Sequence, residues 1–401
     1  MPARIVKVLY DDSLAANPAG TGTFTRSLLQ ALQKTPGVDV VATRLGSSSL
    51  ASVDVARKPP RRRLLSAIEH LRYFALDLPA RARRTGCDVI YSPTGLGPLR
   101  GRIPSVITVH DLTPLRFPET VDRLSRTYLR EMLRLQLRRS AAVCAVSRAI
   151  AAEVRERFPS LDAGRVYVIP DAPDPALMGA TPAPVEQADR PFFLMVGTIE
   201  PRKNHITAIR AFARYVREHP DAPELLVLAG SPGWLYQPVF DEVAHLGMEA
   251  RVRRVGRVDA GRLQWLYRHA RGLLFPSLYE GFGIPVVEAF ALECPVIASA
   301  IPSVIEVSGD GTATLLDPLD IEAWAVAIQV AASAPPDARR LAAARLRAQA
   351  FTWEASALAL REALLAVSPA SAPGSAPARR RQPDRGRHRR PPPPGRPPGA
   401  N

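Results

Sequence analysis

The chain has 401 residues, 46% of them hydrophobic, and a formal net charge of +15, which suits a globular protein with two domains of ordinary size. Its apolar runs all fall short of the roughly 20 residues that a membrane-spanning helix needs, so the sequence excludes a protein of that class. Cys87, Cys144 and Cys294 lie far apart without metal-binding spacing, which favours a reduced, cytoplasmic setting.

The first half of the chain predicts a parallel sheet covered by helices. We expect its N-terminus to form a strand rather than a signal peptide, because the apolar run is short and acidic residues follow it. Further β-branched runs alternate with helical patterns such as "GTFTRSLLQALQKT", and this alternation is typical of a sheet with both faces covered. The predicted strands are residues 5–10, 39–45, 89–92, 106–110, 142–146 and 166–169.

The same alternation restarts in the second half, after a proline-rich stretch, residues 170–191, that indicates a linker. The predicted strands there are residues 192–198, 224–230, 251–258, 272–277, 295–300 and 313–318. We therefore predict the α/β class with two doubly wound, Rossmann-like domains facing a cleft, where such sheets bind ligands. The predicted parts are residues 1–170, a linker 171–190, a second domain 191–350, a C-terminal helix 351–367 and a disordered tail 368–401 rich in proline and arginine.

The positive charge is concentrated in three places. The tail carries eight arginines and one aspartate from Arg379 onward, and residues 57–84 and 123–139 are also rich in arginine. A basic surface attracts anionic partners such as acidic lipid, phosphate or nucleic acid, without choosing among them.

The sequence "MVGTIEPRKNH", residues 195–205, presents two adjacent cations after a buried strand. The strand ends at Gly197, and a turn with Arg202 and Lys203 precedes a helix. Arginine can bind a pyrophosphate through two hydrogen bonds while lysine adds a point charge. The alternative is a solvated pair of cations in a loop.

The sequence "LYEGFGIPVVE" places Glu280 and Glu288 on either side of a glycine loop, with seven residues between them. We expect Pro285 to occupy the first position of a helix, whose N–H groups attract anions. Two glycines allow the backbone to approach a ligand closely, and carboxylates accept hydrogen bonds from sugar hydroxyls. The alternatives are that Glu288 only favours the helix dipole and that Glu280 is a surface acid.

Two weaker signals come from the first domain. Gly20 and Gly22 open a helix after the first strand, but their spacing is not a dinucleotide fingerprint, so a structural turn and a ligand loop both fit. His110 follows a buried strand, where it could face the cleft and donate a hydrogen bond or carry a proton, or serve a structural role. The seven histidines show no metal-binding spacing.

Taken together, these segments closely resemble family 4 of the retaining glycosyltransferases, which have the GT-B fold. The resemblance covers nearly the whole chain except the tail. It rests on "VHDLTPLRFPE", "AVSRAIAAEV", "VYVIPD", "VGTIEPRKNH", "VGRV", "LFPSLYEGFGIPVVEAFALECPVIAS" and "GDGTATLLDP". The chain departs from the family where Ile305-Glu306 replaces a Pro-Glu pair, where Asp171-Ala172 replaces Asn-Gly, and where "NPAGTGTF" replaces a more glycine-rich loop.

The resemblance implies roles for particular residues. The first domain would bind the acceptor, the second a nucleotide-sugar donor, and the C-terminal helix would cross back to the first domain. His110 would contact the donor sugar near the reacting carbon, and Glu288 would bind the ribose. The other implied donor contacts are Arg202 and Lys203 on the diphosphate, Glu280 with the backbone of Gly281, Phe282 and Gly283 on the sugar, and Gly22 and Gly197 beside them.

We therefore predict a hexosyltransferase that transfers a sugar with retention, by front-face attack, to a glycan or lipid-linked acceptor in surface polysaccharide assembly. The motifs look most like those of bacterial mannosyltransferases, which favours GDP-mannose over a UDP-sugar. With no cofactor or metal expected, Arg202, Lys203 and a helix N-terminus would stabilise the leaving diphosphate. The basic helices suit peripheral contact with the anionic inner face of the cytoplasmic membrane, although a solvated basic face fits equally.

Two functions of other classes compete with this prediction. A catalytically inactive GT-B subunit would only bind a nucleotide sugar, but Arg202, Lys203, Glu280 and Glu288 are all present. Binding of nucleic acid through the basic tail is disfavoured because the tail is appended to a fold with other signatures.

Overall fold

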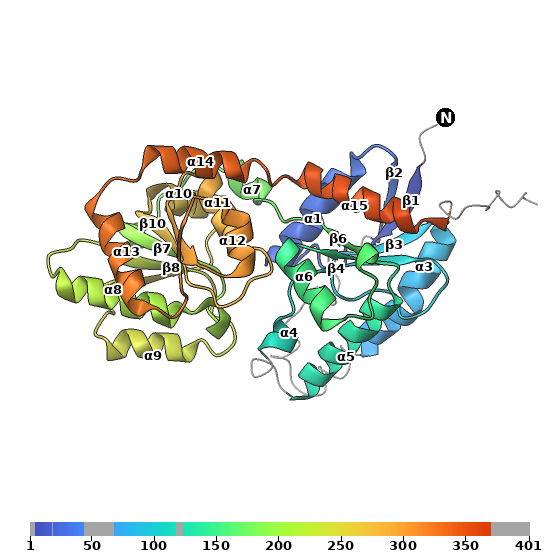
Figure 1. The fold of residues 1–401 in the computed structure, drawn as a ribbon, viewed down its shortest axis with the longest axis horizontal. Helices are drawn as coiled ribbons and strands as arrows, with labels where there is room; N and C mark the ends of the chain where they lie inside the picture. The colour runs from blue at the N-terminus through green and yellow to red at the C-terminus, as the bar shows by residue number, and fades with distance from the viewer. Residues whose placement is uncertain (1–4, 18, 44–67, 118–122, 370–401) are drawn as a thin grey trace, which may run out of the picture.

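The computed structural model describes residues 5–17, 19–43, 68–117 and 123–369. Figure 1 shows two lobes side by side, each a sheet with helices on both faces. The predicted tail lies outside the described residues from position 370 onward, as do residues 57–67 of the basic region 57–84.

The first lobe contains a six-stranded parallel sheet in the order β2-β1-β3-β4-β5-β6. Its central strands are buried along their whole length, as expected for strands covered on both faces. The strands are β1 (Val6–Tyr10), β2 (Val38–Ala42), β3 (Val89–Ser92), β4 (Ser105–Val109), β5 (Ala142–Ala145) and β6 (Val166–Val168).

The second lobe contains another six-stranded parallel sheet, in the order β12-β11-β10-β7-β8-β9. The order reverses between β7 and β10, so the crevice at their carboxyl ends is the place where a doubly wound sheet binds its ligand. The strands are β7 (Phe192–Val196), β8 (Leu225–Ala229), β9 (Val252–Gly256), β10 (Gly272–Phe275), β11 (Val296–Ser299) and β12 (Thr314–Leu316).

Helices connect most of the successive strands. In the first lobe they are α1 (Gly20–Gln33), the π-helical turn η3 (Tyr73–Asp77), α3 (Leu78–Thr85), α4 (Thr113–Arg116), α5 (Arg123–Arg139), α6 (Arg148–Arg157) and the short turn η5 (Ala163–Arg165). The second lobe has η7 (Pro201–Lys203), α8 (His205–Glu218), α9 (Gln237–His245), α10 (Ala260–His269), α11 (Ile284–Ala291), α12 (Pro302–Ser308), α13 (Ile321–Ser333) and α14 (Ala338–Ala348).

The predicted fold class is confirmed. The predicted strands agree with β1–β12 to within two residues at each end, except that β2 ends at Ala42 and positions 44 and 45 lie outside the described residues. Pro285 is the second rather than the first residue of α11, because the helix begins at Ile284.

The last helix, α15 (Trp353–Val367), leaves the second lobe and packs against α1 of the first. At its start, Trp353 meets Phe24 of α1 with ring centroids 5.7 Å apart. Leu360 and Leu364 are fully buried in the core of the first lobe. The chain therefore crosses between the lobes twice, once in the linker and once before α15.

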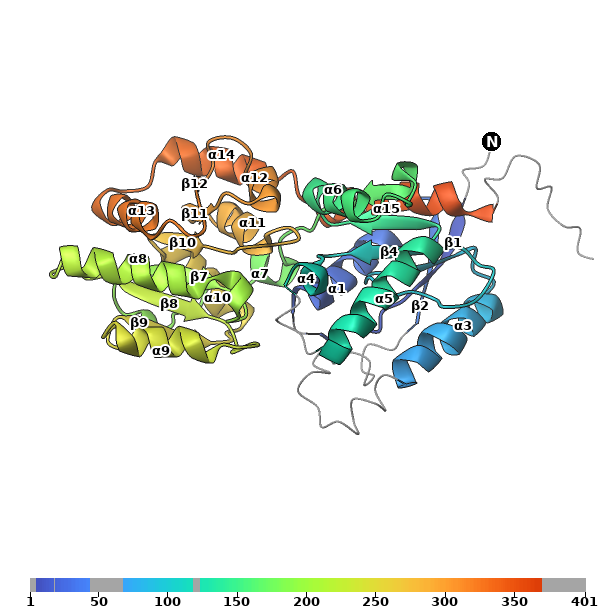
Figure 2. The ribbon, with the colours of Figure 1, turned by 60° about the horizontal axis from the view of Figure 1, so that its bottom comes forward.

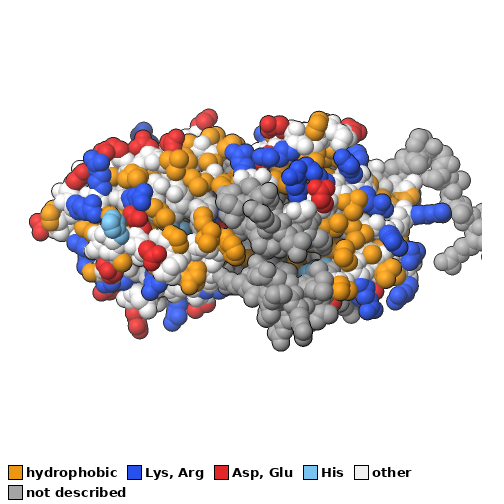
Figure 3. All heavy atoms as spheres, turned by 90° about the horizontal axis from the view of Figure 1, so that it is seen from below, with side chains coloured by type: hydrophobic (Ala, Val, Ile, Leu, Met, Phe, Trp, Pro, Cys, Tyr) orange, Lys and Arg blue, Asp and Glu red, His pale blue; other side chains and the backbone are white. Residues whose placement is uncertain are grey.

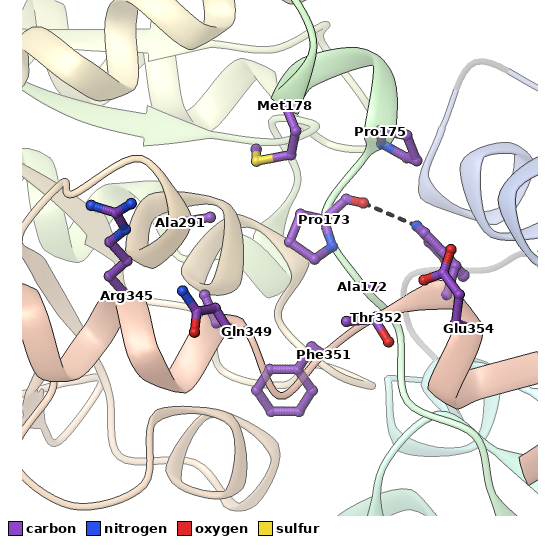
Figure 4. A pocket seen from close by; sticks show the side chains of 12 residues that line it. Ala172, Pro173, Pro175, Met178, Ala291, Arg345, Gln349, Phe351, Thr352 and Glu354 are labelled. Carbon is purple, nitrogen blue, oxygen red and sulfur yellow. Dashed lines mark hydrogen bonds between the residues drawn. The ribbon is translucent and has the colours of Figure 1, made fainter. Parts of the chain in front are cut away.

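The linker has more structure than its composition predicts. It contains α7 (Pro175–Met178) and the short turn η6 (Glu186–Ala188), and Leu177 is buried. The C-terminal crossing is tied to it, because the indole Nε1 of Trp353 donates a hydrogen bond to the carbonyl oxygen of Pro173 at 3.0 Å (Figure 4). A pocket of about 370 Å³ lies where the two crossings meet, and none of the predicted site residues lines it.

Replacing Leu360 with alanine should lower the free energy of unfolding by about 2–5 kcal/mol, because the side chain is fully buried between α15 and the first lobe. Urea denaturation would measure this change. Leu358→Ala on the same helix is the control, since Leu358 is 51% exposed and should change stability by about 0.5 kcal/mol or less. Equal effects of the two substitutions would contradict the docking of α15.

Candidate functional site

Two loops meet at the switch point of the second sheet. The loop after β7 runs from Gly197 to the short turn that holds Arg202 and Lys203. The loop after β10 carries Glu280 and leads into α11. The backbone N–H of Leu278 donates to the carbonyl oxygen of Arg202 at 2.8 Å, which joins the two loops directly.

Glu280 lies between the two predicted phosphate-binding cations. Its carboxylate accepts a hydrogen bond from Lys203 Nζ at 2.6 Å and another from Arg202 Nη1 at 2.9 Å. Arg202 also donates to Glu200 Oε1 through Nη2 at 2.7 Å, and to the carbonyl oxygen of Tyr279 at 2.9 Å. We call Glu200, Arg202, Lys203 and Glu280 the charged cluster; its formal charges sum to zero.

Burial and neighbouring charges act in opposite directions on the pKa values of the charged cluster. Glu280 is 7% exposed, and burial alone would raise its pKa. The positive charges of Lys203 and Arg202 outweigh burial and lower the pKa of Glu280 to about 2. Burial likewise acts to lower the pKa of Arg202, but Glu280 and Glu200 raise it overall. Glu280 and Arg202 are therefore both charged at neutral pH.

Two glycines shape the loop after Glu280. A Cβ atom at Gly281 would stand 1.8 Å from the carbonyl oxygen of His110, so only glycine allows the loop to touch the first lobe. Gly283 has a φ of 113° and precedes α11, and no side chain caps the helix there. This backbone conformation favours glycine, and the N-terminus of α11 keeps its positive partial charge for an anion.

The side chain of Phe282, which lies between these glycines, packs against the C-terminal crossing and not against the charged cluster. Its buried ring meets Phe351 edge-on at 5.2 Å between centroids. Its side chain therefore anchors the loop to the C-terminal crossing, and only its backbone is available to the site.

The first lobe contributes His110 and the start of α1. His110 follows β4, its Nε2 lies 2.8 Å from the carbonyl oxygen of Pro93, and its ring meets Phe24 edge-on at 4.6 Å. Burial lowers the pKa of His110, which favours the neutral imidazole. A Cβ at Gly22 would collide with the carbonyl oxygen of Asn17, so Gly22 is needed for the tight approach of the preceding loop.

Glu288 lies one turn inside α11, away from the charged cluster. Its Oε2 accepts a hydrogen bond from the hydroxyl of Tyr267 at 2.9 Å, and the backbone of Asp174 in the linker also bonds to it. Burial raises the pKa of Glu288 to about 7. Since this pKa is raised, ionisation of the buried group near neutral pH opposes folding.

The structure thus brings together some of the predicted residues and separates others. Arg202, Lys203 and Glu280 are in direct contact, and a Cβ at Gly197 would lie 3.6 Å from Lys203 Cε. The side chains of Phe282 and Glu288 have other partners. Among the residues that the structure describes, no group of three or more His, Cys, Asp or Glu side chains could hold a metal ion.

Sequence reasoning missed the residues that join the lobes at this site. The hydroxyl of Ser147 donates to the carbonyl oxygen of Gly281 at 2.6 Å, and the hydroxyl of Tyr279 reaches the first lobe. Glu306 accepts hydrogen bonds from the backbone of Arg148 and Ala149. Ser147 and Tyr279 belong to quoted family motifs, and Glu306 to a pair where the chain departs from the family, but no local pattern indicates a contact with the other lobe.

Two doubly wound domains, with a charged cluster at the switch point of the second, define the GT-B class of α/β proteins. Residues 18–177 match the family model described as Glycosyltransferase Family 4, and residues 181–347 match the one described as Glycosyl transferases group 1. The chain belongs to the family 4 glycosyltransferases, and it is a glycosyltransferase.

Relatives of known activity are similar over part of the chain. O-antigen chain mannosyltransferase B of Escherichia coli is 31% identical over 264 residues, which cover 62% of this chain and 67% of that protein. O-antigen chain mannosyltransferase RfbU of Salmonella typhimurium is 30% identical over 226 residues, which cover 56% of this chain and 59% of that protein. An alpha-maltose-1-phosphate synthase of Mycolicibacterium smegmatis is 28% identical over 351 residues, 80% of this chain and 88% of that protein.

Solved structures share the fold at lower identity. Sucrose-phosphate synthase from Thermosynechococcus elongatus superposes with a TM-score of 0.69 at 23% identity, covering 92% of this chain and 100% of that one. Anabaena Alr3699/HepE, solved in complex with UDP and glucose, superposes with a TM-score of 0.63 at 20% identity, covering 90% and 100%.

Replacing Glu280 with glutamine should lower the free energy of unfolding at pH 7 by about 3 kcal/mol, because two partly buried cations lose their anionic partner. The folded-state pKa of Glu280, about 2, lies below its ordinary value of 4.5. Its stabilisation is therefore complete above pH 4.5 and is lost as the pH falls through about 2. Urea denaturation at neutral and acidic pH should show the two proteins converging.

Glu293→Gln is the matched control. Glu293 pairs with Arg345 at 2.7 Å, but about half of each side chain is exposed, so its loss should cost under about 1 kcal/mol. A Glu280→Gln protein as stable as wild type at pH 7 would contradict the electrostatic account of the charged cluster.

Proposed function

We propose that this glycosyltransferase transfers a mannosyl group from GDP-mannose to a glycan or lipid-linked acceptor of a surface polysaccharide, with retention of configuration. The observation that carries the proposal is the charged cluster at the switch point of the second domain, where Gly281, next to Glu280, packs against the backbone of His110 in the first domain. The two O-antigen mannosyltransferases support the choice of sugar.

The hydrogen bonds of the charged cluster indicate different roles for Arg202 and Lys203. Arg202 donates through Nε, Nη1 and Nη2 to Glu200, Glu280 and the backbone of Tyr279, so most of its donors are occupied. Lys203 uses one N–H of its ammonium group on Glu280. We therefore assign the first contact with the diphosphate to Lys203, and to Arg202 the task of holding Glu280 in place.

From the same geometry we assign contacts to the diphosphate, the sugar and the ribose of the donor. The diphosphate would lie toward the N-terminus of α11, whose positive partial charge helps the leaving group without a divalent ion. Glu280 would then accept hydrogen bonds from hydroxyls of the sugar, and Glu288 from those of the ribose. Neutral His110, whose Nε2–H bonds to the carbonyl oxygen of Pro93, would accept a hydrogen bond from the sugar near the reacting carbon through Nδ1, while a diphosphate oxygen takes the acceptor's proton on the same face.

A UDP-sugar is the competing donor. It is supported by the fold shared with Anabaena Alr3699/HepE, whose structure contains UDP, whereas the more similar sequences are mannosyltransferases. An inactive nucleotide-sugar-binding subunit is disfavoured because the charged cluster is complete and Lys203 keeps N–H donors for a phosphate.

Lys203→Met should abolish most nucleotide binding and lower turnover of GDP-mannose by about 100-fold, the loss that follows removal of one transition-state donor. Glu280 keeps Arg202 as a partner in this variant, so the fold should survive. Thermal shifts with GDP and UDP would measure binding, since a ligand of the native state raises its melting temperature. We expect a larger shift with GDP than with UDP in the wild-type protein.

Lys34→Met is the control, because Lys34 is an exposed residue at the end of α1. It removes the same charge and should leave binding and turnover unchanged. Undiminished turnover in Lys203→Met would rule out the phosphate role, and a larger shift with UDP would reassign the donor.

We also propose that the first domain docks on an anionic membrane through a surface made by residues 68–85 and by residues 130–139 of α5, which we call the α3–α5 surface. Figure 3 shows hydrophobic side chains beside Lys and Arg side chains on the lobe at its right. No helix in the described ranges is both long and apolar enough to cross a bilayer. The exposed apolar residues are Ile68, Leu71, Leu76 and Leu135, and the exposed basic ones are Arg72, Arg83, Arg84, Arg130, Arg138 and Arg139.

Replacing both Leu71 and Leu76 with aspartate should weaken binding to phosphatidylglycerol vesicles at least about tenfold, because two apolar contacts are lost and acids face an anionic surface. Sedimentation with vesicles would measure the binding, and added salt should weaken it further. Leu346→Asp on α14 is the control, since Leu346 is 70% exposed on the other lobe. Equal binding by the double variant and wild type would contradict this surface.

A further inference from the structure

Tyr279, the residue before Glu280, places its side chain in the opposite lobe. Its ring is buried, 7% exposed, and packs near Phe117 and under the guanidinium of Arg116. Its hydroxyl accepts a hydrogen bond from the backbone N–H of Leu112 at 2.9 Å and donates one to Glu153 Oε2 at 2.9 Å. The phenol therefore bridges the loop after β4 and helix α6.

The main chain of the same residue belongs to the charged cluster. Its carbonyl oxygen accepts the bond from Arg202 Nη1, at the same nitrogen that binds Glu280. The side chain of Tyr279 is thus bound by the first lobe, and its carbonyl group is bound by Arg202 of the second. Tyr279 therefore connects the first lobe directly to the charged cluster.

Helix α6 receives two further contacts from the second lobe, and Figure 2 shows it beside α12. Ser147, which caps α6, donates to the carbonyl oxygen of Gly281. The carboxylate of Glu306 accepts from the first backbone N–H groups of α6 at 2.8 and 2.9 Å, where an acid is favoured by the helix dipole. The contacts on α6 are thus specific polar bonds that would break together if the lobes separated.

We propose that Tyr279 is a positioning residue that couples closure of the two lobes to the placement of Arg202 and Glu280. With the lobes closed, the phenol is held by Leu112 and Glu153, and the backbone at 279–281 is fixed relative to both the cluster and His110. When the lobes part, the phenol leaves its site, and the carbonyl group that orients Arg202 moves with it. The inference rests on the proposed function only in assuming that the donor occupies this cleft.

The test compares Tyr279→Phe with Tyr215→Phe in the full-length protein. Tyr215 is also buried and donates to Glu224 Oε2 at 2.9 Å, but both residues lie within the second lobe, so this control loses the same kind of bond away from the cleft. Small-angle scattering without ligand should give a larger radius of gyration for Tyr279→Phe than for wild type or the control. Turnover of GDP-mannose should fall about tenfold, which corresponds to about 1.4 kcal/mol.

Glu306→Ala is the second variant, because it removes another bond to α6 without altering the loop of Glu280. It should open the protein in scattering as Tyr279→Phe does. The proposal is overturned if Tyr279→Phe matches Tyr215→Phe in both scattering and turnover, or if it loses turnover while its scattering stays that of wild type. If wild type neither binds GDP nor consumes GDP-mannose, the proposed function fails, but the scattering comparison still decides whether Tyr279 and Glu306 hold the lobes together.

Discussion

A buried carboxylate is the constraint on which this site depends. Glu280 is almost fully removed from water, and its charge is tolerated only because Lys203 and Arg202 lie within hydrogen-bonding distance. This pairing fixes the loop after β7 against the loop after β10. The two loops that flank the switch point are therefore joined by these bonds, which orient the charged groups as electrostatic stabilisation of a leaving group requires.

Much of the fold could be predicted from the sequence because both sheets are parallel and buried. Such strands appear as short apolar runs separated by helical patterns, and this signal is local. The start of α11 was also predictable, from Pro285 and the glycines before it. The composition of the linker misled the prediction, because proline-rich sequence does not show that Leu177 is buried against neighbouring elements.

The sequence predicted which residues belong to the site, but not which contacts they make with one another. "EPRKN" and "YEGFG" identify the charged residues, yet nothing in either segment indicates that Glu280 binds both cations across 77 and 78 positions of sequence. The partners of Tyr279 and Glu306 depend on how two separately folded lobes meet. A contact between domains joins residues far apart in the sequence and leaves no periodic pattern in either segment. Local sequence patterns therefore cannot predict it.

The neutrality of the charged cluster explains why closure matters for a diphosphate ligand. Since two acids already balance Arg202 and Lys203, the cluster as a whole offers a diphosphate no net charge, and its attraction comes from oriented N–H groups at short range. Such an interaction is strong only where water is excluded. In this chain the first lobe meets the loop of Glu280 where Gly281 packs against the backbone of His110, with no room for a side chain between them, so the chemistry of the second lobe depends on the first lobe being in place.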